Sequence, residues 1–406
     1  MARPPACGFP FASLSLGIMN DVSLERAAAC ALNRIFGYEP RISQELIAHF
    51  GSAAPVFSLS EDELFGIFGP GNRHRTEICT EALDNAAAEL DRLERRGCRF
   101  ISCTEEAFPA LLKECPDSPA GLYIRSSSPV EEIFLTRPAV SIVGTRDISL
   151  YGKEWCPKIV EVLANARQRP TVVSGLAIGV DVTAHLAAMG YSLPTIAVLP
   201  TGIDSVYPLR HSTVADKIAA EPGCALISDF PPGTSPEKQN FLRRNRIIAG
   251  MSGATILVES KLHGGGMITA QLAHSYGRDV FALPGRVEDL RSQGCNELIR
   301  TKVAEPLSSL PLLPEALGLG CYNRRRVADF EQEVNGRYGN IFTDRREALV
   351  EIAHLIRKRR GMTADDICAA TGRSYQEVSY LIGILESDAF IDVNLLGQCT
   401  IHTKFA

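Results

Sequence analysis

Six short runs of apolar and β-branched residues, separated by helical segments, constrain the fold of this chain more than any other feature. The runs lie between Arg99 and Ser308 and read AVSIVG, TVVSG, TIAVLP, ALISD, ATILVES and DVFALPG. Such alternation is typical of a parallel sheet whose strands are covered by helices on both faces. We therefore predict a Rossmann-like α/β domain over residues 97–308. Ligands of such sheets bind beyond the carboxyl ends of the strands, so the loops after these runs form the candidate site.

The first 96 residues have a helical pattern instead. Ile42, Leu46 and Ile47 form one apolar stripe, and Ser60 is placed to cap the segment EDELFGIF. We predict a small bundle over residues 1–96, similar to helix-hairpin-helix or sterile-alpha-motif domains. Such bundles sometimes bind the DNA backbone and more often dock proteins, and the sequence leaves both roles open.

The C-terminal part is predicted to be a linker over residues 309–340 and a winged helix over residues 341–406. Three helical patterns there are followed by a segment that resembles a hairpin. The third helical pattern carries Glu377, Glu386 and Asp388 but no Lys or Arg. A helix that reads the major groove needs cationic or amide side chains. We therefore expect this domain to dock a protein or support a dimer rather than to recognise duplex DNA.

Composition sets limits on the ligand and the compartment. The net charge of the 406 residues is −5, so any affinity for a phosphate backbone has to come from a local patch. The 12 cysteines form no CxxC and no Cys/His cluster with ligand spacing, so we predict neither a metal nor a cofactor. No stretch is long and apolar enough for a membrane span or a signal peptide, and we expect a cytoplasmic protein without a membrane partner.

The loop in SIVGTRDISLYG is the first candidate for anion binding. A strand ends at Val143, and Gly144, Thr145 and Arg146 follow it. A glycine turn that enters a helix presents free N–H groups to an anion, and Arg146 adds a bidentate donor. The segment matches neither the dinucleotide nor the P-loop pattern, so a purely structural turn remains an alternative.

The second loop lies in VVSGLAIGVDVTAH. Ser174, Gly175 and Gly179 form a flexible segment after a strand, and a phosphate nest is one interpretation. Asp181 and His185 are four residues apart on one helix face. We favour the alternative in which these two side chains pair and hold the loop rigid.

The third loop, SDFPPGTSPEKQNFLRRNRIIAGMS, interleaves cations with an aromatic ring. Single-stranded nucleic acid needs such a pattern, because cations follow its backbone and a ring stacks on a base. A solvated basic helix end is the less favoured alternative. The spacing places Arg243 and Arg246 on one face, so at least one arginine is expected to be structural. The candidate residues are Lys238, Phe241, Arg243, Arg244, Asn245 and Arg246.

The fourth loop, VESKLHGGGMITAQ, leads from Glu259 to the glycines Gly264, Gly265 and Gly266. Phosphate binding and tight packing are equally compatible with these glycines. An enzyme that cleaves nucleoside monophosphates, of the phosphoribohydrolase type, is the main alternative function. Its PGGxGTxxE loop carries a catalytic acid after the glycines, and no acid stands there in this chain.

Taken together, these strings resemble the DNA-processing protein A (DprA/Smf) family. The resemblance rests on SIVGTR, SGLAIGVDVTAH, TIAVLPTGIDSVYP, ISDFPPGT, FLRRNRIIAGMS, LVES, MITAQLA, GRDVFALPG and GCNELI, which span Ser141 to Ile299 in order. It implies an extended Rossmann fold that binds single-stranded DNA as a dimer, loads the RecA recombinase during natural transformation and has no catalytic activity.

The resemblance also implies which residues contact DNA. Arg146, Lys238 and Phe241 would be the contacts, with Ser174 and Gly175 in the same pocket. The chain departs from the family in three places. Ile178 stands where a basic residue is frequent, Leu242 replaces a proline, and the run from Gly264 to Gly266 replaces SGS.

Overall fold

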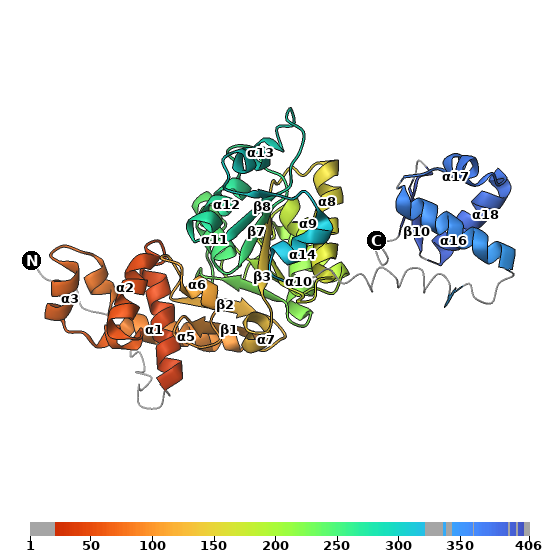
Figure 1. Ribbon diagram of the computed structural model, residues 1–406. Helices are drawn as coiled ribbons and strands as arrows, with labels where there is room; N and C mark the ends of the chain where they lie inside the picture. Colours follow the sequence, from red (N-terminus) through yellow and green to blue (C-terminus); the bar gives the residue numbers. More distant parts are fainter. Residues whose placement is uncertain are drawn as a thin grey trace, which may run out of the picture. The chain divides into compact units, whose positions relative to one another are not determined.

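The computed structural model describes residues 21–320, 336–337, 343–359, 361–388, 390–394 and 397–401. The chain divides into two compact units. The first comprises residues 1–148, 171–185 and 194–306, and the second comprises 149–170, 186–193 and 307–406. The observed architecture confirms the predicted fold class: N-terminal helices, a mostly parallel sheet with helices, and a small C-terminal region of helices and a hairpin (Figure 1).

From Asp21 onward, five α-helices precede the first strand of the first unit. Figure 1 shows the sheet after them. The predicted cap at Ser60 is confirmed: its side chain accepts the N–H of Glu63, and the Glu63 carboxylate accepts the N–H of Ser60. Leu46 and Ile47 of the predicted stripe are buried. The helices are α1 (Asp21–Ile35), α2 (Pro40–Phe50), α3 (Glu61–Phe68), α4 (His74–Glu77) and α5 (Thr80–Glu94).

A buried polar network joins these helices to the sheet. The hydroxyl of Tyr123 donates to a carboxylate oxygen of Glu89 on α5 at 2.8 Å, and the Cys30 thiol of α1 lies 3.2 Å from that hydroxyl. Arg34 completes the network with an ion pair to Glu89. Burial raises the pKa of the Cys30 thiol, so the group stays protonated and inert. The helical region is therefore fixed to the sheet.

Nine strands form one sheet in the order β1-β2-β6-β5-β4-β3-β7-β8-β9. All six predicted runs are strands, whereas β1, β2 and the two-residue β9 were not predicted. The pairs β1–β2 and β2–β6 are antiparallel and the remaining pairs are parallel. The strands are β1 (Cys98–Ser102), β2 (Gly121–Arg125), β3 (Ala139–Val143), β4 (Thr171–Ser174), β5 (Thr195–Val198), β6 (Ala225–Ser228), β7 (Ala254–Leu257), β8 (Asp279–Ala282) and β9 (Glu305–Pro306).

The strand order reverses at β3. From β3 the sheet grows in one direction through β4, β5 and β6, and in the other through β7, β8 and β9. The carboxyl ends of β3 and β7 therefore flank the switch point, where sheets of this type bind ligands. The helices that follow the parallel strands in this unit include α9 (Val180–Gly190), α11 (Lys238–Gly250) and α12 (Gly265–Ser275). Every residue of β4, β5, β6 and β7 is buried, as expected for a sheet covered on both faces.

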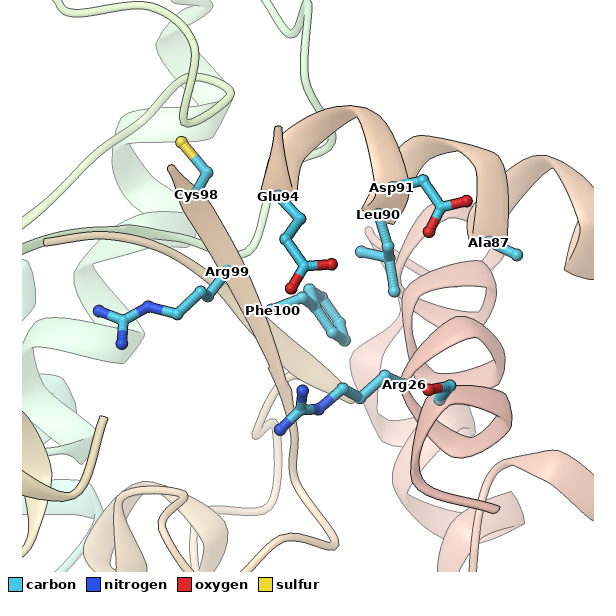
Figure 2. A pocket seen from close by; sticks show the side chains of 9 residues that line it. Arg26, Ala87, Leu90, Asp91, Glu94, Cys98, Arg99 and Phe100 are labelled. Carbon is cyan, nitrogen blue, oxygen red and sulfur yellow. The ribbon is translucent and has the colours of Figure 1, made fainter. Parts of the chain in front are cut away.

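One cavity of about 110 Å³ lies among α1, α5 and β1. Figure 2 shows Arg26, Glu94 and Phe100 around it, one from each of these elements. Arg26 is engaged in an ion pair with Glu105 at 2.6 Å. None of the residues that line this cavity belongs to the predicted site.

The second unit contains α8 (Leu150–Ala164) and a C-terminal group of helices. That group comprises α16 (Thr343–Lys358), α17 (Ala364–Thr371), α18 (Tyr375–Ser387) and the antiparallel hairpin of β10 (Ile391–Val393) and β11 (Cys399–Ile401). Its core includes Ile352, Val378, Leu381 and Leu385, so α16 and α18 pack together through apolar side chains. The start of the predicted linker contains the short helix α14 (Leu313–Ala316), and residues 321–335 and 338–342 lie outside the described residues.

Two expected absences concern membranes and metals. No helix in the described segments is long and apolar enough to cross a membrane. Over the same segments, no group of three or more His, Cys, Asp or Glu residues is placed to hold a metal ion. The N-terminal segment considered as a signal peptide, residues 1–15, lies outside the described residues.

Candidate nucleic-acid interface

The loop after β3 is held by backbone contacts and exposes Arg146. The N–H of Thr145 donates to the carbonyl of Glu259 at 2.7 Å, and the carbonyl of Thr145 accepts the N–H of Val180 at 3.1 Å. A Cβ at Gly144 would lie 2.6 Å from a methyl carbon of Val180, so only glycine fits there. The side chain of Arg146 remains exposed at the carboxyl-end side of the sheet.

Arg146 meets the first turn of α11. Its guanidinium lies over the ring of Phe241, 4.7 Å from the ring centroid. Phe241 is half-buried, and Lys238, three residues earlier on the same helix face, is exposed. We call Arg146, Lys238 and Phe241 the cation–aromatic cluster. The structure thus brings together two loops that lie about a quarter of the chain apart in sequence.

Two of the predicted arginines are occupied within the protein. Arg243 and Arg246 both pair with Asp229, whose side chain is fully buried at the end of β6. Arg243 also lies between the rings of Tyr38 and Phe230, at 4.8 and 4.6 Å from their centroids. Burial lowers the pKa of Arg243, and Asp229 opposes that shift. These contacts agree with the expectation that at least one arginine is structural.

Arg244 explains the glycine in the second loop. Its guanidinium donates to the carbonyl of Val198 at 3.0 Å, and a Cβ at Gly175 would lie 1.5 Å from Nη1 of Arg244. Burial lowers the pKa of Arg244 to about 10, while the nearby Asp181 carboxylate raises it and Arg146 lowers it further. Burial also raises the pKa of Asp181, and Arg244 counters that effect. Gly175 therefore makes room for a buried cation that lies behind Arg146.

The other residues predicted to act in the second loop, Ser174, Asp181 and His185, are also buried. Ser174 donates to the carbonyl of Ile142 at 2.6 Å and has no exposed surface. Asp181 accepts the N–H of Ala177 at 3.4 Å, which agrees with an acid that holds this loop. The expected Asp181–His185 pair is wrong, because Nδ1 of His185 lies 2.7 Å from the Thr195 hydroxyl and its Nε2 has no partner.

The fourth loop, after β7, packs against the first loop, after β3, through its glycines. A Cβ at Gly266 would lie 3.0 Å from Cα of Gly144, so these two backbones pack directly. Gly264 is the N-cap of α12 and is crowded by the Ser260 hydroxyl, whereas Gly265 is exposed and faces open space. The buried Asn245 donates to the carbonyl of Gly265 at 3.5 Å. Tight packing accounts for Gly266, whereas a Cβ at Gly265 would meet no atom within 4 Å.

Tyr207 lies beside Phe241, although it is not among the residues predicted from the sequence. It follows β5, and its ring centroid lies 5.5 Å from that of Phe241, with the two planes at 76°. It is 42% exposed. The string TIAVLPTGIDSVYP contained the signal, an aromatic residue in a loop after a buried strand, but no cation is next to it in sequence.

Comparison with known proteins identifies the family. The model of the family described as DNA recombination-mediator protein A matches residues 99–316. This chain belongs to that family. It is 33% identical over 290 residues to the protein Smf of Synechocystis sp., covering 71% of this chain and 72% of that protein.

Two solved structures of DNA processing protein A are similar to this chain. The X-ray structure from Streptococcus pneumoniae matches with 29% identity and a TM-score of 0.56, over 72% of this chain and 95% of that chain. A structure from Helicobacter pylori, which concerns the single-stranded DNA binding mode of that protein, has 29% identity and a TM-score of 0.47 over 54% and 95% of the chains.

The buried His185 predicts acid sensitivity. Burial lowers its pKa to about 3, and Arg244 and His211 add to that effect. The folded state therefore keeps the ring neutral, and this stability is complete above the ordinary pKa of about 6.5 and is lost as the pH falls towards 3. Lowering the pH from 7 to 5 should reduce the free energy of unfolding by about 2 kcal/mol through this group. His185→Gln should remove that part of the decrease in urea unfolding, whereas His263→Gln, at an exposed site, should retain it. Equal decreases in both variants would contradict the assignment.

Removing the Asp229 carboxylate, which two arginines share, is expected to lower the free energy of unfolding strongly. Asp229→Asn leaves two buried guanidinium groups without a counter-charge, so we expect a loss of about 3–5 kcal/mol. Asp147→Asn is the matched control, because its pair with Arg291 is exposed and should cost less than about 1 kcal/mol. Chemical denaturation measures both, and a similar loss in the two variants would disprove the role given to Asp229.

Proposed function

We propose that this protein binds single-stranded DNA at the cation–aromatic cluster. The observation that carries the proposal is the guanidinium of Arg146 placed over Phe241, one helical turn from Lys238, at the carboxyl-end side of the sheet. Cations beside a partly exposed ring suit a phosphate backbone with unpaired bases. The net charge of −5 over the whole chain makes such a local arrangement necessary.

The proposed contact set is smaller than the set predicted from the sequence. Arg146, Lys238 and Phe241 supply charge and stacking, and the backbones of Gly144 and Gly265 border the site. Thr145 positions the loop, because its N–H and its carbonyl are both bonded within the protein. The other predicted residues support these contacts from within the protein: Ser174, Gly175, Arg243, Arg244, Asn245, Arg246 and Gly264. We assign them to holding α11 and the second loop in place.

The biological role that we propose follows from membership of a recombination-mediator family. The protein would protect incoming single-stranded DNA and deliver it to the RecA recombinase during natural transformation in the cytoplasm, acting as a homodimer. Family membership supports the mediator role. The acidic third helix of the C-terminal domain supports a docking function there, because Glu377 lies in its first turn and Tyr375 and Tyr380 are exposed on it.

Cleavage of nucleoside monophosphates is the weaker proposal. The acid available beside the fourth loop is Glu259, and its side chain is fully buried. A carboxylate that stabilises a developing sugar cation has to reach the substrate. We therefore propose a protein that binds DNA without catalysis.

Removal of the two exposed cations tests the proposed function. Arg146→Ala combined with Lys238→Ala should weaken binding of an oligothymidylate and flatten its salt dependence. Each lost phosphate contact should reduce the slope of log K against log salt by about 0.7, because fewer counterions are released. Fluorescence anisotropy at several salt concentrations measures both quantities.

The matched control removes two cations of α5. Arg92 and Arg95 are exposed there, so the double alanine variant changes the net charge by the same amount. Its affinity and salt slope should equal those of the unaltered protein. If the two double variants lose the same affinity and show the same salt slope, the DNA site does not lie at the cation–aromatic cluster.

A further inference from the structure

We propose that Tyr207 is a second base-stacking surface, which accepts an unpaired nucleobase beside the one on Phe241. The inference rests on the proposed function and adds a binding residue to it. Tyr207 lies in the loop between β5 and the short helix η3 (Leu209–His211), and 42% of its surface is exposed. Its ring is next to that of Phe241, at 5.5 Å between centroids.

The angle between the Tyr207 and Phe241 rings determines whether one base or two can stack on them. The planes of Tyr207 and Phe241 meet at 76°, so one flat base cannot lie face to face on both. The guanidinium of Arg146 lies over one face of the half-buried Phe241 ring, so that face is not free for a second base. A second base therefore has to use the separate surface of Tyr207. The two rings form a corner that a strand with unstacked, flexible bases can follow.

Hydrogen bonds fix the loop that carries Tyr207, both before and after this residue in the sequence. Before it, the hydroxyl of Thr201 donates to the carbonyl of Ser205 at 2.8 Å, and the Asp204 carboxylate accepts the N–H of Gly233 at 3.0 Å. After it, the N–H of His211 donates to the carbonyl of Pro208 at 2.9 Å. His211 is buried, and its Nδ1 lies 2.8 Å from the carbonyl of Leu176 in the second loop. The backbone on both sides of Tyr207 is thus already fixed in the free protein. Binding of a base therefore costs little entropy for ordering this loop.

The chemistry of the surface selects the ligand class. Every nucleobase has a flat π-face, so an exposed aromatic ring accepts any of the four bases. In a duplex these faces are already stacked on their neighbours. The corner of Tyr207 and Phe241 therefore favours unpaired over paired DNA and reads no sequence.

The test compares Tyr207→Ala, Phe241→Ala and the double variant in binding oligothymidylate to the full chain. A stacked base contributes about 1–3 kcal/mol, so Tyr207→Ala should weaken binding about 5- to 150-fold. The salt slope should not change, because no phosphate contact is lost. Tyr207→Phe keeps the ring and should bind as the unaltered protein does.

The double variant separates stacking from support of Phe241. If Tyr207 binds its own base, Tyr207→Ala weakens binding in the Phe241→Ala background as well. If Tyr207 only positions Phe241, the double variant binds like Phe241→Ala alone, and the inference is overturned. A protein that shows no affinity for oligothymidylate before any substitution would instead overturn the proposed function itself.

A fluorescence reporter gives a second readout that does not depend on an alanine variant being stable. Trp155 is the only tryptophan in the sequence, so Trp155→Phe with Tyr207→Trp places a single reporter at the corner. Stacking predicts that oligothymidylate quenches its emission and that inorganic phosphate does not. Bound oligonucleotide without quenching would also overturn the inference.

Discussion

The ion pairs of Asp229 with Arg243 and Arg246 determine how α11 is presented. One fully buried carboxylate at the end of β6 binds two guanidinium groups of the helix, so this face of α11 is turned towards the sheet. The helical repeat then leaves Lys238 exposed and Phe241 half-buried. Tyr38, which follows the first helix of the chain, stacks on Arg243 and donates to Asn240 at 3.2 Å. The helical region thereby helps to hold the turn that we propose to bind DNA.

Close approach of backbones places Arg146 opposite this turn. The loops after β3 and β7 pack through Gly144 and Gly266, where a Cβ on Gly266 would come within 3.0 Å of the other glycine. Gly179 has a positive φ of 90°, and a Cβ there would lie 2.2 Å from the carbonyl oxygen of Thr145. Behind them the buried Arg244 fills the space beside Gly175. Most glycines that the sequence suggested as phosphate ligands therefore serve packing, and the ligand-facing charge comes from side chains.

Much of the fold and part of the site could be predicted from the sequence. The six buried strands were predictable because their apolar runs alternate with helices, and this alternation also placed Arg146 and Lys238 on the same side of the sheet. The antiparallel strands β1 and β2 were missed because they precede that alternation. The roles of Arg243 and Arg246 depend on Asp229, and only the three-dimensional packing shows that one carboxylate faces both. His185 was paired with Asp181 from helical spacing, but burial directs it to Thr195.

Photocrosslinking of a 5-iododeoxyuridine oligonucleotide to the full chain, followed by mass spectrometry of the peptides, tests the central claim most directly. The claim is that unpaired bases lie on the corner built by the loops after β5 and β6. If bases stack on both rings, crosslinks should appear on the peptides that contain Tyr207 and Phe241. Crosslinks concentrated instead on the helices α1 to α5, or on α16 to α18, would contradict it.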